Sequence, residues 1–562
     1  MKVVIVGGVA GGATAAARIR RLDESARILI FERSGYISYA NCGLPYYIGD
    51  VITDPEELTL QTPESFFERF RIEAKVRHEV TAVLPEEKAV RVKDLTTGRE
   101  FTESYDKLIL SPGARPTLPR LPGADVRRLF TLRTVEDTLA IKAFINEKKP
   151  RSAVLAGGGF IGLELAENLR GLGMEVTIVQ RPKQVMNLFD PEMAAFLHGE
   201  LRRNGVTLAL GRTVEALRER DEQVDVLLTG GETLTADMVV MALGVTPDTA
   251  LAKEAGLELG MKGSILVNDR METSCPDIYA VGDAVQVKNF VTGQDALISL
   301  AGPANKQARI AADNICGGDS RYPGSLGSSV VHLFGLTAAC TGVSETNAAK
   351  AGLETDKLYL SPMNHASYYP GGQVMTVKAV FEKNTWRLLG AQIVGGEGAD
   401  KRIDVLAAAI QSGMDVRSLA GLQLAYAPPY ASAKDPVNLI GYMAENLSRG
   451  LVKNFHWHEL DGLPRDGSAV LLDVRTPGEY ARGHGEGFIN IPVDELRERM
   501  AEIPRGKPTY VNCQSGLRSY IACRILSQEG FDCYNLSGGW RLYSTAVKDA
   551  AAAKQALPCG RE

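Results

Sequence analysis

Two glycine-rich turns, each placed between a short apolar run and a helix-forming run, constrain the fold of this chain more than any other feature. The first turn is GGVAGG at residues 7–12, after the apolar run 3–6. The second is GGGFIG at residues 157–162, after the run 153–156. A strand, a glycine-rich turn and a helix N-terminus together place backbone N–H groups around a pyrophosphate. The repeat therefore predicts two doubly wound nucleotide-binding domains.

The strand that follows each turn ends differently. In the first unit the strand over 27–31 ends at Glu32, whose carboxylate can accept hydrogen bonds from a ribose. In the second unit the strand ends at Gln180 and Arg181, and Lys183 follows. A neutral residue beside cations does not repel a 2′-phosphate, although these charges can equally be solvated loop residues. The sequence leaves open whether the second nucleotide carries a 2′-phosphate.

Length and charge set the wider limits. The chain has 562 residues, which suits three or four domains at roughly 150 residues each. Its formal net charge of −5 gives no global field that would attract nucleic acid or an anionic membrane. No apolar run approaches the roughly 20 residues of a membrane span, and the first residues do not form a signal peptide. We therefore expect a cytoplasmic protein with no nucleic-acid or membrane partner.

Cys42 stands apart from the other cysteines. The eight cysteines lack the paired spacing of a zinc site and are too sparse for a secreted disulfide framework, so no metal is expected. Cys42 lies just beyond the first nucleotide unit, in YANCGLPYY at residues 39–47. A lone cysteine in a loop is ordinarily a small buried apolar residue. Its place between two nucleotide units favours a redox thiol instead.

The stretches GGVAGG and SYANCGLPYYIG together resemble coenzyme A-disulfide reductases and the related NAD(P)H-dependent persulfide and polysulfide reductases, over nearly the whole chain. Flavin disulfide reductases with an internal disulfide carry CxxxxC here, but the partner position in this chain is Tyr47. Cys42 must then pair with an external thiol or cycle through sulfenic acid. Relatives that form sulfenic acid typically carry a histidine in the first glycine-rich loop, and residues 1–77 contain none.

The resemblance implies FAD in the first domain and NADH or NADPH in the second. The stretch ETSCPDIYAVGDA then places Asp283 at the ribityl chain of the flavin, and LILSPGARP, which contains Gly113, is similar to the strand and turn that leave the flavin domain. The expected cofactor-binding residues are Gly7, Gly8, Ala10, Gly11, Gly12, Glu32, Arg33, Gly113, Asp283, Gly157, Gly159, Gly162, Glu164 and Arg181.

Basic residues on the first helix suggest a phosphorylated ligand. Arg18 and Arg21 are three residues apart, so they share a helix face. Arginine binds phosphate through paired hydrogen bonds, although a solvated basic face explains the pattern as well. The resemblance favours coenzyme A, either as a substrate or as a bound cofactor. Its expected contacts are Thr14, Arg18, Arg21, Ser38, Asn41, Arg71, Asn305 and Lys434.

Two tyrosines of the third domain complete the expected catalytic set. In related reductases two tyrosines approach the reactive cysteine of the partner subunit, and the spacing favours Tyr368 and Tyr426. A phenolic hydroxyl can protonate a leaving thiolate. The resemblance thus implies a homodimer whose active sites each use both chains.

The C-terminal part contains the strand TYVN, then the loop 513–519 and a helix. Such a short connection points loop N–H groups inward, where they stabilise a thiolate or a persulfide. The loop CQSGLRS resembles the CxxGxRS loop of rhodanese domains. The expected loop residues are Cys513, Gln514, Ser515, Gly516, Leu517 and Arg518, with Cys513 catalytic, whereas Cys523 and Cys533 are expected to be structural.

These observations predict an α/β fold with two Rossmann-like domains, an α+β dimerisation domain and a C-terminal rhodanese α/β domain. The expected boundaries are 1–115 with 245–321 for FAD binding, 116–244 for NAD(P)H binding, 322–445 for dimerisation, 446–462 for a linker, 463–546 for the rhodanese domain and 547–562 for a tail.

The expected activity is a single-cysteine reduction of coenzyme A persulfide, coenzyme A disulfide or polysulfide, with sulfane sulfur handled at the rhodanese loop. Two alternatives remain. One is an NADH oxidase with an accessory sulfurtransferase, and the other is a redox sensor that uses coenzyme A as a ligand.

Overall fold

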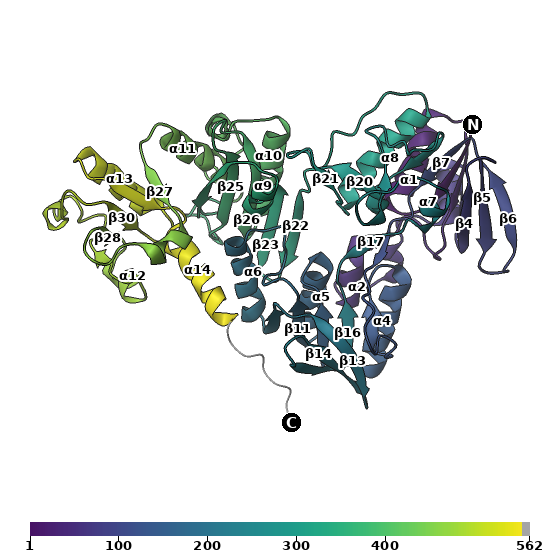
Figure 1. Ribbon diagram of the computed structural model, residues 1–562, viewed down its shortest axis with the longest axis horizontal. Helices are drawn as coiled ribbons and strands as arrows, with labels where there is room; N and C mark the ends of the chain where they lie inside the picture. Colours follow the sequence, from purple (N-terminus) through teal and green to yellow (C-terminus); the bar gives the residue numbers. More distant parts are fainter. Residues whose placement is uncertain (554–562) are drawn as a thin grey trace. The chain divides into compact units, whose positions relative to one another are not determined.

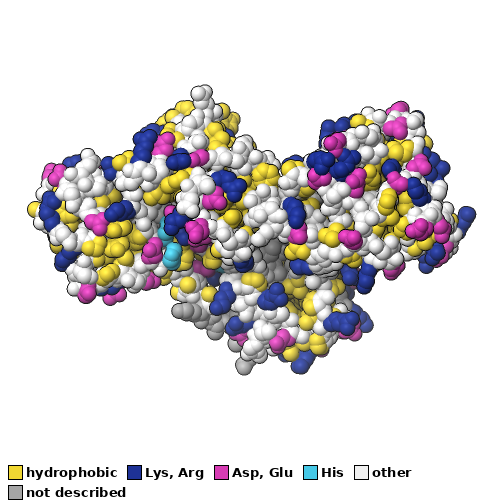
Figure 2. All heavy atoms as spheres, turned by 45° about the horizontal axis from the view of Figure 1, so that its top comes forward, with side chains coloured by type: hydrophobic (Ala, Val, Ile, Leu, Met, Phe, Trp, Pro, Cys, Tyr) yellow, Lys and Arg dark blue, Asp and Glu magenta, His cyan; other side chains and the backbone are white. Residues whose placement is uncertain are grey.

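The computed structural model describes residues 1–553. These residues form two compact units (Figure 1). The first unit contains Met1–Lys183 and Gly205–Gly327, and the second contains Gln184–Asn204 and the chain from Ser328 onward. Lysine and arginine side chains are interspersed with acidic ones over the face seen in Figure 2, in keeping with the small net charge.

None of the helices among residues 1–553 is long and apolar enough to span a membrane.

The first unit begins with a five-stranded parallel sheet in the order β19-β7-β1-β2-β3. Apart from the edge strand over 72–75, its strands are nearly continuous apolar runs, as expected for a sheet covered on both faces. Helices α1 and α8 pack against each other beside it. The elements are β1 (Lys2–Val6), α1 (Ala10–Leu22), β2 (Arg27–Phe31), β3 (Ile72–Lys75), β7 (Lys107–Leu110), β19 (Ile278–Ala280) and α8 (Ala301–Ile315).

Glycine is required where the first turn meets the sheet. Gly7 has a φ of +93°, which favours glycine. A Cβ atom on Gly12 would lie 1.9 Å from the Gly7 carbonyl oxygen. The second turn repeats this approach, because a Cβ on Gly162 would lie 2.0 Å from the Gly157 oxygen. The repeat seen in the sequence is therefore a repeat of close strand–helix packing.

A second five-stranded parallel sheet of the first unit has the order β12-β11-β10-β16-β9. Its elements are β9 (Leu129–Thr131), α4 (Val135–Lys148), β10 (Ser152–Ala156), α5 (Phe160–Gly171), β11 (Glu175–Gln180), β12 (Val206–Leu210) and β16 (Met238–Met241). Smaller elements complete the unit: α2 (Leu44–Ile48), α3 (Pro63–Phe70), β4 (His78–Leu84), β5 (Ala89–Asp94), β6 (Glu100–Ser104), β8 (Ala114–Pro116), β13 (Val214–Arg220), β14 (Gln223–Leu228), β15 (Thr233–Ala236), β17 (Val245–Pro247), α7 (Ala250–Glu254), β18 (Ile265–Leu266), β20 (Val285–Lys288) and β21 (Asp295–Ala296).

The second unit contains a five-stranded antiparallel sheet in the order β22-β23-β26-β25-β24. Its elements are β22 (Ser329–Leu333), β23 (Leu336–Gly342), α9 (Glu345–Lys350), β24 (Thr355–Leu360), β25 (Thr376–Glu382), β26 (Leu388–Gly395), α10 (Ala399–Gln411) and α11 (Pro436–Ser448). This is the α+β arrangement expected from the sequence.

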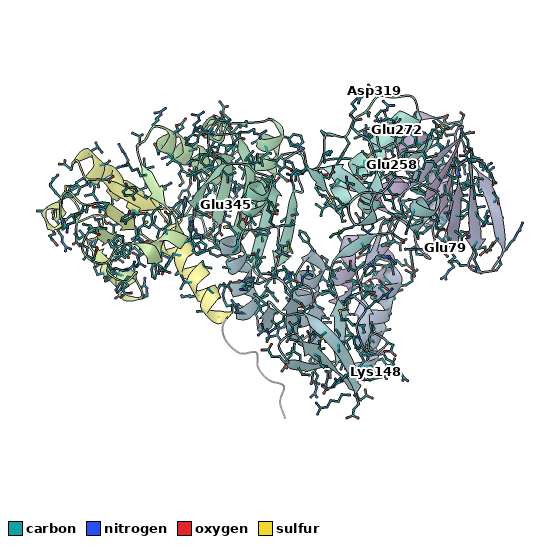
Figure 3. All side chains as sticks on the ribbon, viewed as in Figure 1. Glu79, Lys148, Glu258, Glu272, Asp319 and Glu345 are labelled. Carbon is teal, nitrogen blue, oxygen red and sulfur yellow. The ribbon has the colours of Figure 1, made fainter. Side chains whose placement is uncertain are left out.

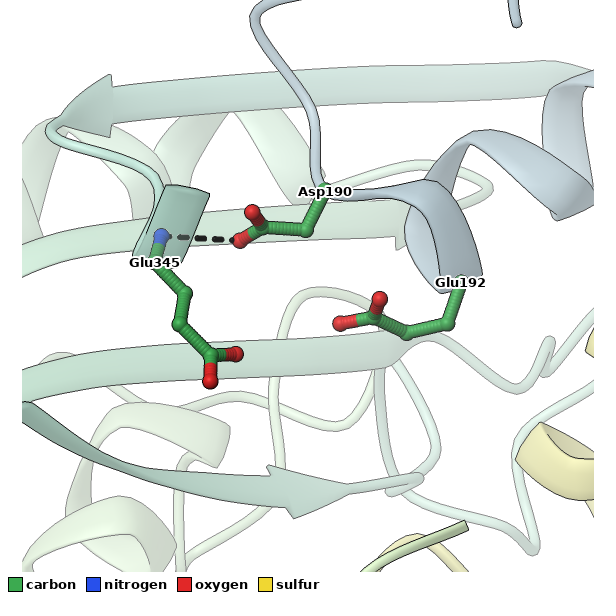
Figure 4. Close-up of side chains that lie close together, drawn as sticks. All are labelled: Asp190, Glu192 and Glu345. Carbon is green, nitrogen blue, oxygen red and sulfur yellow. Dashed lines mark hydrogen bonds between the residues drawn. The ribbon is translucent and has the colours of Figure 1, made fainter. Parts of the chain in front are cut away.

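Helix α6 (Pro191–Arg203) belongs to this second unit, although its sequence lies within the range expected for NAD(P)H binding. A buried charge cluster explains this. Lys378 of β25 is fully buried, and its Nζ lies 2.8 Å from Asp190, 2.6 Å from Glu192 and 2.8 Å from Glu345. Figure 4 shows these carboxylates converging, and Figure 3 places Glu345 in the unit. Although burial opposes ionisation, Lys378 holds the pKa of Asp190 below its usual value.

The C-terminal module has a five-stranded parallel sheet in the order β27-β31-β30-β28-β29. Its elements are β27 (Lys453–Phe455), β28 (Val470–Asp473), α12 (Pro477–Ala481), β29 (Ile489–Asn490), β30 (Thr509–Asn512), α13 (Leu517–Gln528), β31 (Cys533–Leu536) and α14 (Gly539–Ala552).

Two boundaries of this module differ from the expectation. The expected linker 446–462 contains β27, which pairs with β31 and forms an edge of the sheet. The expected tail begins at residue 547, but α14 continues to Ala552 because it packs against α6. Asp549 of α14 binds His198 Nδ1 at 2.8 Å and Arg202 at 2.6 Å, and both partners lie on α6. The remainder of the expected tail, 554–562, lies outside the described residues.

Candidate active site

The first glycine-rich turn holds Glu32 in place. Gly8 N–H donates to one carboxylate oxygen of Glu32 at 2.9 Å, and Ser34 N–H donates to the other, also at 2.9 Å. Glu32 is buried. Each oxygen keeps a lone pair that a ribose hydroxyl can use. The side chain predicted to bind the ribose is thus oriented beside the turn by backbone groups.

Asp283 and Arg133 form a second polar pair in this unit. Asp283 lies in a short 3-10 helix after β19, and the Arg133 guanidinium donates to it at 2.6 Å. Gly113 has a φ of +70°, and a Cβ there would meet only the far end of Arg133, at 3.7 Å. Sequence reasoning missed Arg133, because nothing in its local sequence connects it to Asp283. Arg33 is paired with Asp248 at 2.9 Å.

Gln180 takes the position of Glu32 at the second turn. Gly158 N–H donates to Gln180 Oε1 at 3.0 Å, in the same way that Gly8 donates to Glu32. A Cβ on Gly159 would meet no atom within 4 Å, so the space in front of the turn is open. Arg181, the other residue predicted here, is exposed. The open space and the N–H groups fit a pyrophosphate at this turn.

Cys42 lies in a 3-10 turn, Asn41–Gly43, immediately before α2. Its side chain is exposed, and no disulfide links any cysteine of residues 1–553. The surrounding protein and the negative charge of Glu164 raise the pKa of the Cys42 thiol, against the opposing effect of Arg133. Tyr47 occupies the place where a second cysteine would be needed for an internal disulfide. Cys42 is therefore an accessible thiol whose partner must come from elsewhere.

Among the charged groups near Cys42, Glu164 has the largest effect on the pKa of its thiol. It lies on α5, which packs against α2. Burial, together with the charge of Glu167, raises the pKa of Glu164 to about 7. Burial and Glu164 also raise the pKa of Tyr46 to about 12. Near neutral pH a proton can thus enter or leave this site at Glu164.

A basic cavity lies between α1 and α8. Its volume is about 270 Å³. The lining residues are Thr14, Arg18, Arg21, Asn305, Lys306 and Arg309. Thr14, Arg18, Arg21 and Asn305 were predicted from the sequence. The structure brings Asn305 close to the other three, although it lies more than 280 residues away from them along the chain. Arg18 is also paired with Asp313 at 2.6 Å. The cavity offers several cations to an anionic ligand.

Sequence reasoning missed Lys306 and Arg309, which follow Asn305 on α8. Their spacing from Asn305 places Arg309 on the same face of the helix. This periodicity was visible in the sequence, but only the packing of α8 on α1 shows that both helices face one cavity.

The other predicted ligand contacts are placed separately. Asn41 belongs to the turn that carries Cys42. Ser38 has a φ of +46°, and its N–H donates to the Gly8 carbonyl at 2.8 Å. Arg71 caps the C-terminus of α3. None of these three lines the basic cavity, and Lys434 belongs to the second unit.

Tyr368 and Tyr426 lie together in the second unit. Their hydroxyl oxygens are 2.7 Å apart, and their side chains are 74% and 46% exposed. The hydrogen bond with Tyr368 raises the pKa of Tyr426. Tyr430 is exposed as well, at 71%. Two hydroxyl groups thus meet on an open aromatic surface.

The loop around Cys513 brings hydrogen-bond donors to its sulfur. Cys513 is fully buried at the end of β30, and Gly516 N–H donates to its Sγ at 3.1 Å. Ser519 Oγ lies 3.2 Å from the sulfur and 2.6 Å from Asn535 Oδ1, so its single proton is within reach of both. Ser519, the last residue of the loop motif, was not among the predicted loop residues.

Arg518 forms an ion pair with Glu479. Its guanidinium donates to both carboxylate oxygens of Glu479 at 2.7 Å each. Arg518 lowers the pKa of Glu479 to about 2. The pair fixes the first turn of α13. Cys523 and Cys533 are both buried in the core of the module, as expected for structural thiols.

Comparison with known proteins now adds to this geometry. Residues 1–308 match the family described as pyridine nucleotide-disulphide oxidoreductase, residues 328–436 match its dimerisation domain, and residues 456–546 match the rhodanese-like domain. The chain belongs to the pyridine nucleotide-disulphide oxidoreductase family, whose members depend on FAD and NAD(P)H.

Three relatives are similar to this chain over most of its length. The coenzyme A disulfide reductase of Staphylococcus aureus (strain JH9) is 37% identical over 79% of this chain and 100% of the relative. The crystal structure of reduced Bacillus anthracis CoADR-RHD has a TM-score of 0.95 and 47% identity, covering 98% of each chain. A NAD-dependent persulfide reductase from A. fulgidus has a TM-score of 0.90 and 38% identity, covering 97% of this chain and 100% of the other.

The pH dependence of Cys42 tests the site. In a Glu164→Gln variant we expect alkylation of Cys42 by iodoacetamide to reach half its maximal rate at a pH lower by up to about one unit, because a carboxylate no longer opposes the thiolate. The difference should vanish below about pH 7, where Glu164 of the native protein is itself protonated. The mass of the Cys42 peptide reports the modification. Glu136→Gln is the control, since Glu136 influences Tyr39 instead. An unchanged midpoint in Glu164→Gln would contradict the role given to Glu164.

Proposed function

We propose that this chain uses NADH or NADPH, through FAD, to reduce coenzyme A persulfide, coenzyme A disulfide or polysulfide at Cys42. The observation that carries the proposal is the accessible thiol of Cys42 with no second cysteine in its own turn. The basic cavity in the same unit supplies a place for a phosphorylated thiol. The relatives named above act on coenzyme A disulfide and on persulfide, which supports the same substrate class.

The turn residues would hold both cofactors. Gly8 and Glu32 would bind the diphosphate and ribose of FAD, Asp283 its ribityl chain, and the second turn with Gln180 the NAD(P)H. When bound, FAD accepts two electrons from NAD(P)H and delivers them to sulfur. The protein must orient the nicotinamide, the flavin and Cys42 for this transfer.

The sulfur chemistry balances at Cys42. Its thiolate attacks the inner sulfur of coenzyme A persulfide, a Cys42–coenzyme A disulfide forms, the S–S bond of the persulfide breaks, and hydrosulfide leaves. Two electrons and one proton then convert the mixed disulfide into the Cys42 thiolate and free coenzyme A. With coenzyme A disulfide the leaving group is a coenzyme A thiolate instead.

A homodimer would supply the proton. Residues 328–436 match a dimerisation domain. Tyr368 and Tyr426 lie on an exposed aromatic surface of that domain, with their hydroxyl groups in contact. In a dimer, this hydroxyl pair would protonate the coenzyme A thiolate that leaves when the mixed disulfide at Cys42 of the partner subunit is reduced.

The rhodanese loop would carry sulfane sulfur. Cys513 accepts a sulfur atom as a persulfide, and the N–H of Gly516 stabilises its negative charge. The module is held on the α+β domain by Asp549, Arg541 and Tyr520. Because this docking restrains the module, sulfur carried by coenzyme A accounts for exchange between the two cysteines better than a freely moving domain.

Substitution of each cysteine tests the two roles separately. Cys42→Ser should abolish NAD(P)H-dependent turnover in an anaerobic assay with coenzyme A persulfide, because no nucleophile remains, while the flavin stays bound. Cys513→Ser should remove most sulfur transfer from thiosulfate but leave reduction of coenzyme A disulfide within about twofold, because the Cys42 site is intact. Released sulfide and oxidised NAD(P)H are the readouts.

Other outcomes of this assay would contradict the proposal. Rapid oxygen consumption with little sulfide release would indicate an NADH oxidase. Stoichiometric reduction of the flavin without sustained turnover would indicate a redox sensor. Persulfide reduction retained in Cys42→Ser would remove Cys42 from the mechanism.

The basic cavity gives a second prediction. Arg21→Ala and Arg309→Ala should each raise the KM for coenzyme A disulfide by about tenfold, because each loses a charge-assisted hydrogen bond to phosphate, with kcat little changed. Pantetheine disulfide lacks the phosphates, so its KM should not respond. Arg27→Ala is the control, because Arg27 is exposed and pairs with Glu73 away from the cavity. Unchanged KM values for coenzyme A disulfide would exclude the cavity as the phosphate site.

A further inference from the structure

Residues 537–541 form the back wall of the Cys513 loop. Trp540 N–H donates to the Cys513 carbonyl at 2.8 Å, and Arg541 N–H donates to the Gln514 carbonyl at 3.0 Å. A Cβ on Gly539 would lie 2.6 Å from the Cys513 carbonyl oxygen and 2.7 Å from the backbone nitrogen of Gly516. The backbone at Gly539 is therefore packed directly against the backbone of the Cys513 loop, with no space for a side chain. Any shift of this segment therefore moves the backbone that presents Gly516 N–H to the Cys513 sulfur.

The same segment rests on the α+β domain. Tyr359 N–H of β24 donates to Ser537 Oγ at 3.3 Å. A Cβ on Gly538 would lie 3.1 Å from the Cβ of Tyr359. Arg541 Nε donates to Thr376 Oγ1 at 3.3 Å. The segment is therefore held between the Cys513 loop on one side and Tyr359 on the other.

Tyr359 is itself held firmly. Its side chain is 1% exposed, and its hydroxyl donates to Glu192 Oε1 at 2.6 Å. Lys378 Nζ donates to the same oxygen at 2.6 Å and lies 5.3 Å from the centre of the Tyr359 ring. Burial and the charge of Glu192 raise the pKa of Tyr359, so its hydroxyl remains a donor. The buried charge cluster of Figure 4 thus fixes the side chain whose Cβ faces Gly538.

We infer that Tyr359 is a positioning residue for the sulfur-carrying loop: it braces residues 537–541 so that Gly516 N–H stays aimed at the Cys513 sulfur. The inference rests on the proposed role of Cys513 as the carrier of sulfane sulfur. Tyr359 acts through the backbone, since its hydroxyl is committed to Glu192. Its loss should weaken the stabilisation of an anionic sulfur without removing any group that touches it.

Two variants separate the contributions of the ring and the hydroxyl. Tyr359→Phe keeps the ring and loses the hydrogen bond to Glu192, whereas Tyr359→Leu loses both. Each variant keeps the Cβ and the N–H that face residues 537–538 and changes only what anchors them. Tyr105→Phe is a matched control, because Tyr105 is buried and its hydroxyl has no hydrogen-bond partner among the described residues. Two measurements are made on the full-length holoenzyme. The first is the pH dependence of Cys513 alkylation by iodoacetamide, followed by peptide mass. The second is sulfur transfer from thiosulfate to cyanide.

The probe reaction balances at Cys513. Its thiolate takes the outer sulfur of thiosulfate and releases sulfite, and cyanide then removes that sulfur as thiocyanate and restores the thiolate. We expect Tyr359→Leu to slow this transfer by about tenfold and to move the alkylation midpoint to higher pH, because a donor to the anionic sulfur is weakened. Tyr359→Phe should give a smaller loss of about threefold in the same direction. NAD(P)H-dependent reduction of coenzyme A disulfide should stay within about twofold in both.

A general loss of stability would lower the unfolding temperature but leave the alkylation midpoint of the folded protein unchanged. If both variants keep the native midpoint and transfer rate, the inference is wrong. If Tyr359→Leu does not fold, Tyr359→Phe decides alone by the same criterion. Alkylation does not require sulfur transfer, so a failure of Cys513 as the sulfur carrier would be seen separately, in Cys513→Ser that still transfers sulfur.

Discussion

A single thiol that cannot form a disulfide within its own loop determines how the first unit must work. Cys42 is accessible and has Tyr47 where a second sulfur would be needed. Two electrons cannot be stored there as an internal disulfide, so the oxidised form has to include an atom from outside the loop. A phosphorylated thiol satisfies this requirement. In the proposed function, the cations between α1 and α8 would give such a molecule a place to bind in the same unit.

The second unit joins elements that the sequence assigns to three different domains. Glu192 comes from α6, Lys378 and Tyr359 from the antiparallel sheet, and Gly538 from the C-terminal module. The buried carboxylates would be costly without a cation, and Lys378 offsets that cost only because all of its donors are used. One consequence is that the rhodanese loop is backed by the α+β domain through Tyr359. The proposed sulfur handling at Cys513 would then be coupled structurally to the α+β domain.

Much of this organisation could be predicted from the sequence, because it depends on local patterns. The two glycine turns, the loop of Cys42 and the loop of Cys513 each contain their constraint within about ten residues, so the strand–turn–helix geometry follows directly. What the sequence could not give were contacts between distant segments. Arg133 meets Asp283 across 150 residues, and Lys306 joins Arg18 only because α8 packs on α1.

Boundaries were harder to predict for the same reason. The helix α6 follows the second nucleotide turn in sequence, yet its acidic N-terminus is buried with Lys378 of the second unit. The strand β27 lies in a polar stretch that looks like a linker, and it is ordered by pairing with β31. In each case a long-range partner decides the structure, and no local propensity records that partner.

In the proposed mechanism, the redox partner of Cys42 is an external thiol. The most direct measurement is the mass of the Cys42 peptide from enzyme oxidised anaerobically with coenzyme A disulfide, before and after one equivalent of NAD(P)H is added. We expect a coenzyme A adduct on Cys42 before reduction and a free thiol afterwards, with Cys513 unmodified throughout. A sulfenic acid at Cys42, or a disulfide between Cys42 and another cysteine of the chain, would contradict it.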